Sequence, residues 1–140
     1  MTATASQTLP AGFAYNLKDL MQVAQEKYGL SPREVQHTAQ SLYERGLISY
    51  PLTDSRELAD NMFHVTSRMV RDYKLVSRDR VLDPEYRSCG WVDTLSGAHH
   101  AITVTELSAA AVFGSVEWSE QDTQLYGLIR ARILDMFKRA

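Results

Sequence analysis

The chain has 140 residues, of which 44% are hydrophobic and 23% are charged, so disordered, collagen-like and coiled-coil classes are excluded. Fifteen Lys and Arg stand against seventeen Asp and Glu, and the net charge of −2 gives no basic field for a tight, stand-alone nucleic-acid binder. A single cysteine, Cys89, excludes an intrachain disulfide and a cysteine-based zinc site.

Nothing in the sequence points to a membrane or to export. No apolar run reaches the ~20 residues that a bilayer-spanning helix needs, and the opening MTATASQTLP has neither the basic nor the apolar region of a secretory signal. We therefore expect a cytoplasmic protein with no membrane partner. Residues 1–14 lack apolar periodicity and are predicted to form a flexible tail, followed by one domain over residues 15–140.

Two helices are predicted at the start of this domain. Apolar residues recur at helical spacing over residues 17–28, and Gly29 supplies a C-terminal stop. A capping-box pattern beginning at Ser31 predicts a second helix over residues 32–45. Residues 47–50 then favour a short β-strand. Helix, glycine-containing turn, helix and short strand are typical of a winged helix, so we predict a mainly α (α+β) fold with a small sheet.

A third helix is predicted after this strand. Asp54 or Ser55 would be its N-cap, Glu57 would complete a capping box, and the helix would end near Lys74. Its predicted buried stripe is Leu58, Met62, Val65, Met69, Val70 and Tyr73.

The second half of the chain is predicted to contain less regular structure. Residues 76–97 are expected to form a loop with one short strand around Trp91, and residues 100–105 are expected to be extended. Ser119 is the predicted N-cap of a last helix, with Lys138 and Arg139 in its final turn. The residues of this helix that are expected to be buried are Leu125, Leu128, Ile129, Ile133, Met136 and Phe137.

Four segments carry a resemblance to a known family. Residues 38–55 read TAQSLYERGLISYPLTDS and closely resemble the active-site tyrosine region of type IA DNA topoisomerases, bacterial topoisomerase III in particular. Residues 98–105, AHHAITVT, resemble the family's A-H-[EH]-A-I-x-P-T, with valine where the family has proline. Residues 120–137 resemble the helix that follows it in the family, and residues 15–30 resemble an earlier family segment. The four segments occur in the family's order.

The resemblance implies a domain similar to the winged-helix domain of catabolite activator protein, with Tyr50 as the nucleophile. In the family this tyrosine attacks a phosphodiester of single-stranded DNA, forms a 5′-phosphotyrosyl ester and frees a 3′-hydroxyl. A phenol with a pKa of about 10 is a poor nucleophile at neutral pH, so it needs a neighbouring positive charge or base. His99 matches the histidine that the family uses near the phosphate. Successive residues of an extended segment face opposite sides, so only one of His99 and His100 can face Tyr50.

Further positions are expected to contact DNA. Thr53, Asp54 and Ser55 match the family's T-D-S; we expect them to cap the third helix and to lie near the DNA backbone. His100 is placed with this DNA-binding set. The family has an arginine two residues after the tyrosine, where this chain has Leu52. An isobutyl group cannot replace a guanidinium fork on a phosphate, and Arg56 is the candidate substitute.

The family's Mg²⁺-binding toprim pattern is missing, since the chain has no Asp-x-Asp pair. We therefore expect no metal site and no cofactor in this chain, with Mg²⁺ bound only by a toprim domain. The expected partners are single-stranded DNA and a toprim-containing polypeptide in cis or in trans, and the isolated chain is not expected to relax DNA. The alternative is a non-catalytic, degenerate winged-helix module, because residues 29–48 also resemble winged-helix regulators. A regulator would dimerise and prefer duplex DNA.

Overall fold

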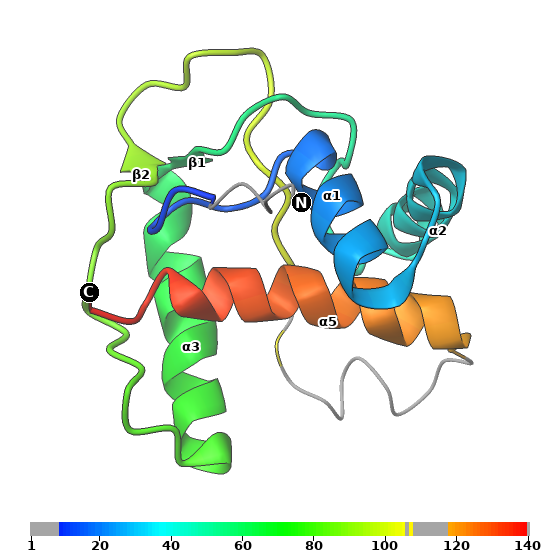
Figure 1. Cartoon of the computed structure of the whole chain (residues 1–140). Coiled ribbons are helices and arrows are strands. Elements are labelled where there is room, and N and C mark those ends of the chain that lie inside the picture. The colour runs from blue at the N-terminus through cyan, green and yellow to red at the C-terminus, as the bar shows by residue number, and fades with distance from the viewer. Residues whose placement is uncertain (1–8, 106, 108–117, 140) are drawn as a thin grey trace, which may run out of the picture.

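The computed structural model of the chain describes residues 9–105, 107 and 118–139. Helices dominate it, together with a two-stranded sheet (Figure 1). The elements are α1 (Leu17–Tyr28), α2 (Pro32–Glu44), β1 (Leu58–Ala59), the 3₁₀ helix η1 (Asp60–Met62), α3 (Phe63–Ser77), β2 (Trp91–Val92) and α5 (Glu120–Asp135). The predicted mainly helical α+β class is confirmed. None of the described helices is long and apolar enough to cross a membrane.

Capping signals fix the first two helices where they were predicted. The Asn16 side chain accepts a hydrogen bond from the Asp19 N–H at the start of α1, and Gly29 ends that helix in the left-handed conformation with φ 70°. Ser31 and Glu34 form the predicted capping box of α2. Both helices therefore begin and end within a residue of the predicted positions.

Helix α5 lies across the molecule and packs against α1 and α2 (Figure 1). Ser119 and Asp122 form its capping box, and every residue predicted to be buried here is buried, including Met136 and Phe137 just after the end of the helix. The prediction that Lys138 and Arg139 lie in the last turn is wrong, because α5 ends at Asp135. The two cations instead pair with carboxylates, Lys138 with Asp135 and Arg139 with Asp83.

The third helix begins later than predicted. Residues 54–57 form side-chain turns, in which the Thr53 hydroxyl accepts from the Ser55 N–H and the Ser55 hydroxyl accepts from the Glu57 N–H. The next residue, Leu58, donates its N–H to the Gly90 carbonyl at 2.8 Å and starts β1. Pairing with a distant strand thus outweighs the local capping signal. Helix α3 then buries Phe63, Thr66, Ser67 and Val70, while Val65 of the predicted stripe is 62% exposed.

The small sheet joins distant parts of the chain. β1 and β2 pair in parallel, with Leu58 opposite Trp91, which confirms the short strand predicted around Trp91. Residues 47–50 do not form a strand but make one antiparallel bridge, between Ile48 and Val104. Because β1 and β2 are parallel, they cannot form a hairpin wing.

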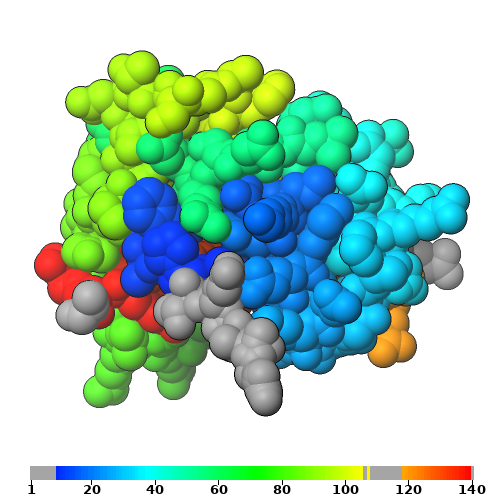
Figure 2. All heavy atoms as spheres, turned by 45° about the horizontal axis from the view of Figure 1, so that its top comes forward, coloured from blue at the N-terminus to red at the C-terminus, as the bar shows by residue number. Residues whose placement is uncertain are grey.

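Residues 9–16, here called the N-terminal strap, lie against the domain (Figure 2). The Arg132 guanidinium donates to the carbonyls of Pro10 (2.7 Å) and Phe13 (2.8 Å). The Gly12 carbonyl accepts from the Gly90 N–H at 3.0 Å and from the Ser88 hydroxyl at 2.8 Å. Residues 9–14, which the sequence places in a tail, are therefore attached to the body by hydrogen bonds.

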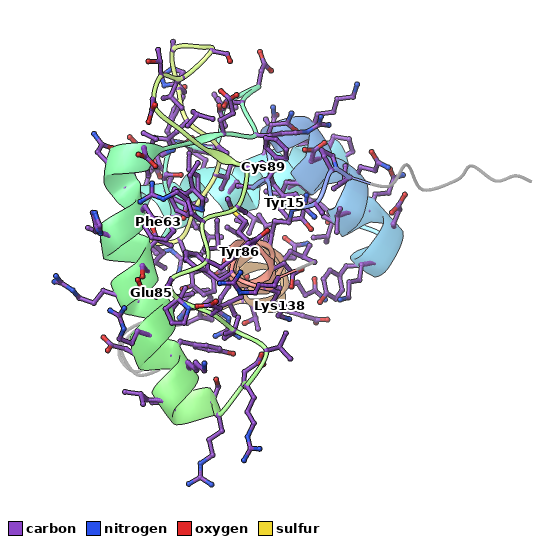
Figure 3. The ribbon with its side chains drawn as sticks, turned by 90° about the vertical axis from the view of Figure 1, so that its left-hand side faces the viewer. Tyr15, Phe63, Glu85, Tyr86, Cys89 and Lys138 are labelled. Atoms are coloured by element: carbon purple, nitrogen blue, oxygen red, sulfur yellow. The ribbon has the colours of Figure 1, made fainter. Side chains whose placement is uncertain are left out.

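Figure 3 looks along α5 onto the side of the molecule where the chain ends. Phe63 points inward from α3, and Tyr15 lies on the opposite side of α5. Phe63 packs against Trp91 and Phe137 with ring centroids 5.1 and 5.7 Å apart, so one aromatic cluster joins α3, β2 and the end of α5. This cluster anchors the strand beside which the strap runs.

Candidate active site

The predicted nucleophile lies in an extended segment, residues 47–55, here called the tyrosine segment. It runs beside residues 101–105: the Ser49 N–H donates to the Thr103 carbonyl at 2.9 Å, and the Thr105 N–H donates to the Leu47 carbonyl at 3.1 Å. These bonds between segments 50 residues apart in sequence place the histidine motif next to the tyrosine. The segment alternates in exposure, so that Pro51 is buried and Leu52 is 46% exposed.

Tyr50 is half-buried and lies between two other rings. Its ring centroid is 5.1 Å from that of His99 and 5.5 Å from that of Tyr43. Within the described part of the chain, the Tyr50 hydroxyl has no hydrogen-bond partner. The structure thus brings the predicted nucleophile and the predicted phosphate-binding histidine together and leaves the phenolic oxygen unpaired.

A cleft of about 530 Å³, here called cleft 1, is lined by Leu52 of the tyrosine segment and by His99, the ring neighbour of Tyr50, although Tyr50 itself is not part of its wall. It collects most of the predicted site: Thr53, Asp54, Ser55, Arg56 and His99 all line it. Its remaining walls are the strap residues Pro10 and Phe13, together with Leu52, Glu57 and residues 96–98. His99 therefore faces both Tyr50 and the cleft.

Glu57 has a role in this cleft that its sequence context did not indicate. The sequence placed it in a capping box, whereas its Oε1 accepts hydrogen bonds from the Ser96 N–H (3.2 Å) and hydroxyl (3.0 Å). The Ala101 N–H also donates to the Glu57 carbonyl at 2.8 Å. Glu57 therefore ties the tyrosine side of the cleft to the loop that leads to His99. No local pattern signals these partners, which are about 40 residues away in the chain.

Arg56 is engaged by a buried carboxylate. Its Nε and Nη2 donate to the two oxygens of Asp19 at 2.7 and 2.8 Å, and the Asp19 side chain is only 3% exposed. These hydrogen bonds to Asp19 raise the pKa of the Arg56 guanidinium above its ordinary value. The predicted third helix would have placed Arg56 in its first turn, whereas α3 begins only at Phe63 and Arg56 precedes it in a non-helical segment. The Nε–Nη2 edge of the Arg56 guanidinium is bound to Asp19, so only the opposite, Nη1–Nη2 edge remains for a phosphate in cleft 1.

The T-D-S residues hold α1 in place rather than capping a helix of their own. The Thr53 carbonyl accepts from the Leu17 N–H at 3.0 Å, and the Asp54 carbonyl accepts from the Asn16 side-chain amide at 3.1 Å. The prediction that they cap the third helix is wrong, because that helix starts at Phe63. These carbonyls instead satisfy donors at the start of α1.

His100 lies outside cleft 1, and the described carboxylates do not form a three-residue metal cluster. The His100 Nδ1 lies 2.7 Å from the Ala101 carbonyl, and the residue does not line cleft 1. Alternation along the segment thus separates it from His99. Across residues 9–105, 107 and 118–139, no three His, Cys, Asp or Glu side chains come together in a group that could hold a metal ion.

Comparison with known proteins matches almost the whole chain to one family. A family model described as DNA topoisomerase matches residues 2–140. The chain belongs to the DNA topoisomerase family. It is 34% identical over 135 residues to DNA topoisomerase 3 of Pasteurella multocida, covering 91% of this chain and 20% of that protein. Against DNA topoisomerase 3 of Staphylococcus epidermidis the identity is 33% over 128 residues, covering 86% and 17%.

A third relative gives the same proportions. DNA topoisomerase 3 of Salmonella typhimurium is 31% identical over 132 residues, which cover 91% of this chain and 20% of the relative. The chain thus spans a fifth or less of the length of each of these relatives. Most of a topoisomerase of this type corresponds to sequence that this chain does not contain.

Proposed function

We propose that this chain is the tyrosine-bearing, winged-helix-like domain of a type IA DNA topoisomerase. It binds single-stranded DNA in cleft 1 and presents Tyr50 for transient strand cleavage. A toprim domain, in cis or in trans, supplies Mg²⁺ and the remaining catalytic groups. The observation that carries this proposal is the contact of Tyr50, whose hydroxyl is unpaired, with the ring of His99, which lines a cleft together with the T-D-S residues.

The proposed reaction exchanges one phosphate ester for another. The Tyr50 oxygen forms a bond to phosphorus, the bond from phosphorus to the 3′-oxygen breaks, and the proton lost by the phenol is balanced by the one gained by the departing 3′-hydroxyl. The reverse step reseals the strand without ATP, because the ester bond is conserved. His99 donates a hydrogen bond to a phosphate oxygen from its position beside Tyr50 and on the wall of cleft 1.

Leu52 supports a second candidate, a non-catalytic DNA-binding domain. Arg56 is the only arginine or lysine among the residues that line cleft 1, and one edge of its guanidinium is bound to Asp19. Leu52 stands where the family has a phosphate-binding arginine. By analogy with the loss of one oxyanion-hole donor, the missing contact costs about 3 kcal/mol of transition-state stabilisation, or roughly a hundredfold in rate.

The two candidates are separated by trapping the covalent intermediate. Single-stranded DNA labelled on the 5′-phosphate side of the break is incubated with the full chain, with and without a separate toprim-containing fragment and Mg²⁺. We expect a labelled adduct only in the complete mixture, and none with Tyr50→Phe. Tyr28→Phe is the matched control. Tyr28 is an exposed tyrosine (39%) that does not line cleft 1 and lies outside the tyrosine segment.

Each outcome has a direct reading. An adduct that persists in Tyr50→Phe refutes the assigned nucleophile. No adduct in the complete mixture, but an adduct after Leu52→Arg, identifies a degenerate domain that lacks only the phosphate contact. If neither form reacts and the chain is a dimer that prefers duplex DNA, the chain is a winged-helix module.

A further inference from the structure

Leu52 borders a second cleft as well as cleft 1. This second cleft, here called cleft 2, has a volume of about 590 Å³ and is lined by Leu52, by residues of one face of α2 and by Gln121 of α5. The α2 residues are Arg33, Glu34, Gln36, His37 and Gln40. Among the residues described as lining the two clefts, Leu52 is the only one that they share. It therefore forms the partition between them.

The position of this partition is fixed by the tyrosine segment. Leu52 is two residues after Tyr50 and is the central residue of a γ-turn, and its side chain borders both cleft 1 and cleft 2. Its neighbours Pro51 and Thr53 are buried, and the Thr53 N–H donates to the Pro51 carbonyl at 2.9 Å. The isobutyl group is thus held outward, 46% exposed, by a backbone that is anchored on both sides. A DNA strand that passes from cleft 1 to cleft 2 meets this side chain.

Two side chains on the α2 wall of cleft 2, those of Arg33 and His37, have no protein partner in the part of the chain that the structure describes. Arg33 and His37 are exposed and four residues apart, so they lie on one face of the helix. Neither side chain has an ion pair or a hydrogen bond within the described ranges. The acidic member of the wall, Glu34, is already committed: one oxygen accepts from the Ser31 N–H and the other from the Gln121 amide. Both donors are neutral and Glu34 keeps its negative charge, so a phosphate on this wall is held at Arg33 and away from the Glu34 carboxylate.

We infer that Leu52 is an apolar divider in the DNA path, an inference that rests on the proposed function. It separates a nucleoside in cleft 1 from its neighbour in cleft 2 and contacts the apolar face of a base or sugar, while Arg33 meets the phosphate on the α2 side. Proteins use exposed leucines in this way as wedges between stacked bases. At this position the chain thus makes a base or sugar contact in place of a phosphate contact, which changes how the strand is held next to Tyr50.

The test is the salt dependence of single-strand binding. Fluorescence anisotropy of a short labelled oligothymidylate is measured at several salt concentrations with the full chain and with variants. We expect Leu52→Ala to weaken binding about four- to fifteenfold, the effect of one to two buried CH₂ groups, with no change in the slope of log K against log salt. Arg33→Gln is expected to lower that slope by about 0.7, the contribution of one phosphate of a single strand.

Val65→Ala is the matched control, since Val65 is an aliphatic side chain of α3 that is 62% exposed and lines neither cleft. Its affinity should equal that of the unchanged chain. The inference is overturned if Leu52→Ala binds as tightly as Val65→Ala, or if it changes the salt slope. Binding is measured without toprim fragment or Mg²⁺, so it is independent of the adduct. An adduct together with unaltered Leu52→Ala binding would refute the divider alone, whereas weakened binding without any adduct would refute cleavage alone.

Discussion

Gly90 is the position where the packing of the N-terminal strap can be tested most directly. Its N–H donates to the Gly12 carbonyl at 3.0 Å, and its own carbonyl accepts from the Leu58 N–H at 2.8 Å. A Cβ at this position would overlap the Gly12 carbonyl oxygen and would lie 2.9 Å from the Met136 Cε and 3.0 Å from the Phe13 Cα. Most of these obstacles are backbone atoms, which cannot rotate away. Gly90→Ala must therefore displace either the strap or β2.

The expected destabilisation follows from these contacts. Overpacking of a tight site costs about 1–3 kcal/mol, and loss of the hydrogen bond to the strap adds about 1 kcal/mol. Gly90→Ala should thus lower the free energy of unfolding by about 2–4 kcal/mol, a large part of the 5–15 kcal/mol typical of a domain. Because Pro10 and Phe13 of the strap line cleft 1, single-strand binding should weaken as well.

The assay is urea unfolding followed by circular dichroism, with the slope of free energy against urea compared between variants. Gly97→Ala is the control: it makes the same chemical change where an added Cβ would have no atom within 4 Å. Its stability should stay within about 0.5 kcal/mol of the unchanged chain. A loss below about 1 kcal/mol in Gly90→Ala would refute the reasoning, since it would mean that the strap is not held against Gly90.

Asp19→Asn should lower the free energy of unfolding by about 1–3 kcal/mol, because it leaves the Arg56 guanidinium facing a buried amide. The measurement is urea unfolding, and an unchanged urea midpoint would contradict the prediction. Hydrogen bonds from Ser31 lower the pKa of Glu34 from 4.5, so this carboxylate contributes stability above that pH and loses it as the pH falls through the lowered pKa. Melting temperatures at pH 3 and pH 7 should therefore differ less in Glu34→Gln, which keeps the capping box, and an equal difference would refute the assignment. Burial raises the pKa of Tyr15 above 10.0, so stability should fall as the pH rises through and above 10. Tyr15→Phe should flatten this alkaline loss in melts between pH 8 and pH 11, and a loss of the same size would show that other groups cause it.

Local chemistry made three of the helices predictable. The capping boxes at Ser31 and Ser119 and the stop at Gly29 use residues within four positions of one another, so the sequence alone contains the whole interaction. The candidate nucleophile could also be identified from sequence, because the motif around Tyr50 is contiguous. Its proximity to His99 followed only from the family resemblance, since the two residues are far apart in the chain.

The third helix starts at Phe63 and not near Ser55, because a contact between distant segments outweighs a local capping signal. Ser55 and Glu57 carry a valid local capping signal, but Leu58 gains more by pairing with a strand whose sequence lies about 30 residues away. The pairing of Arg56 with Asp19 and of Glu57 with Ser96 could not be predicted for the same reason, because the partners are 37 and 39 residues apart in the sequence. A charged side chain near a motif suggests a ligand contact until its partner from another part of the chain is known.

The amino-acid sequence by itself determined the mainly helical class, the ends of α1 and α2 and the start of α5, and it singled out Tyr50 as the candidate nucleophile, because each depends on neighbouring residues. Only the tertiary structure decided that Arg56 is already bound, that the strap forms a wall of cleft 1, and that Leu52 separates two clefts. Those features depend on contacts between segments distant in sequence. Such contacts form only when burial of the shared core offsets the entropy of bringing the segments together.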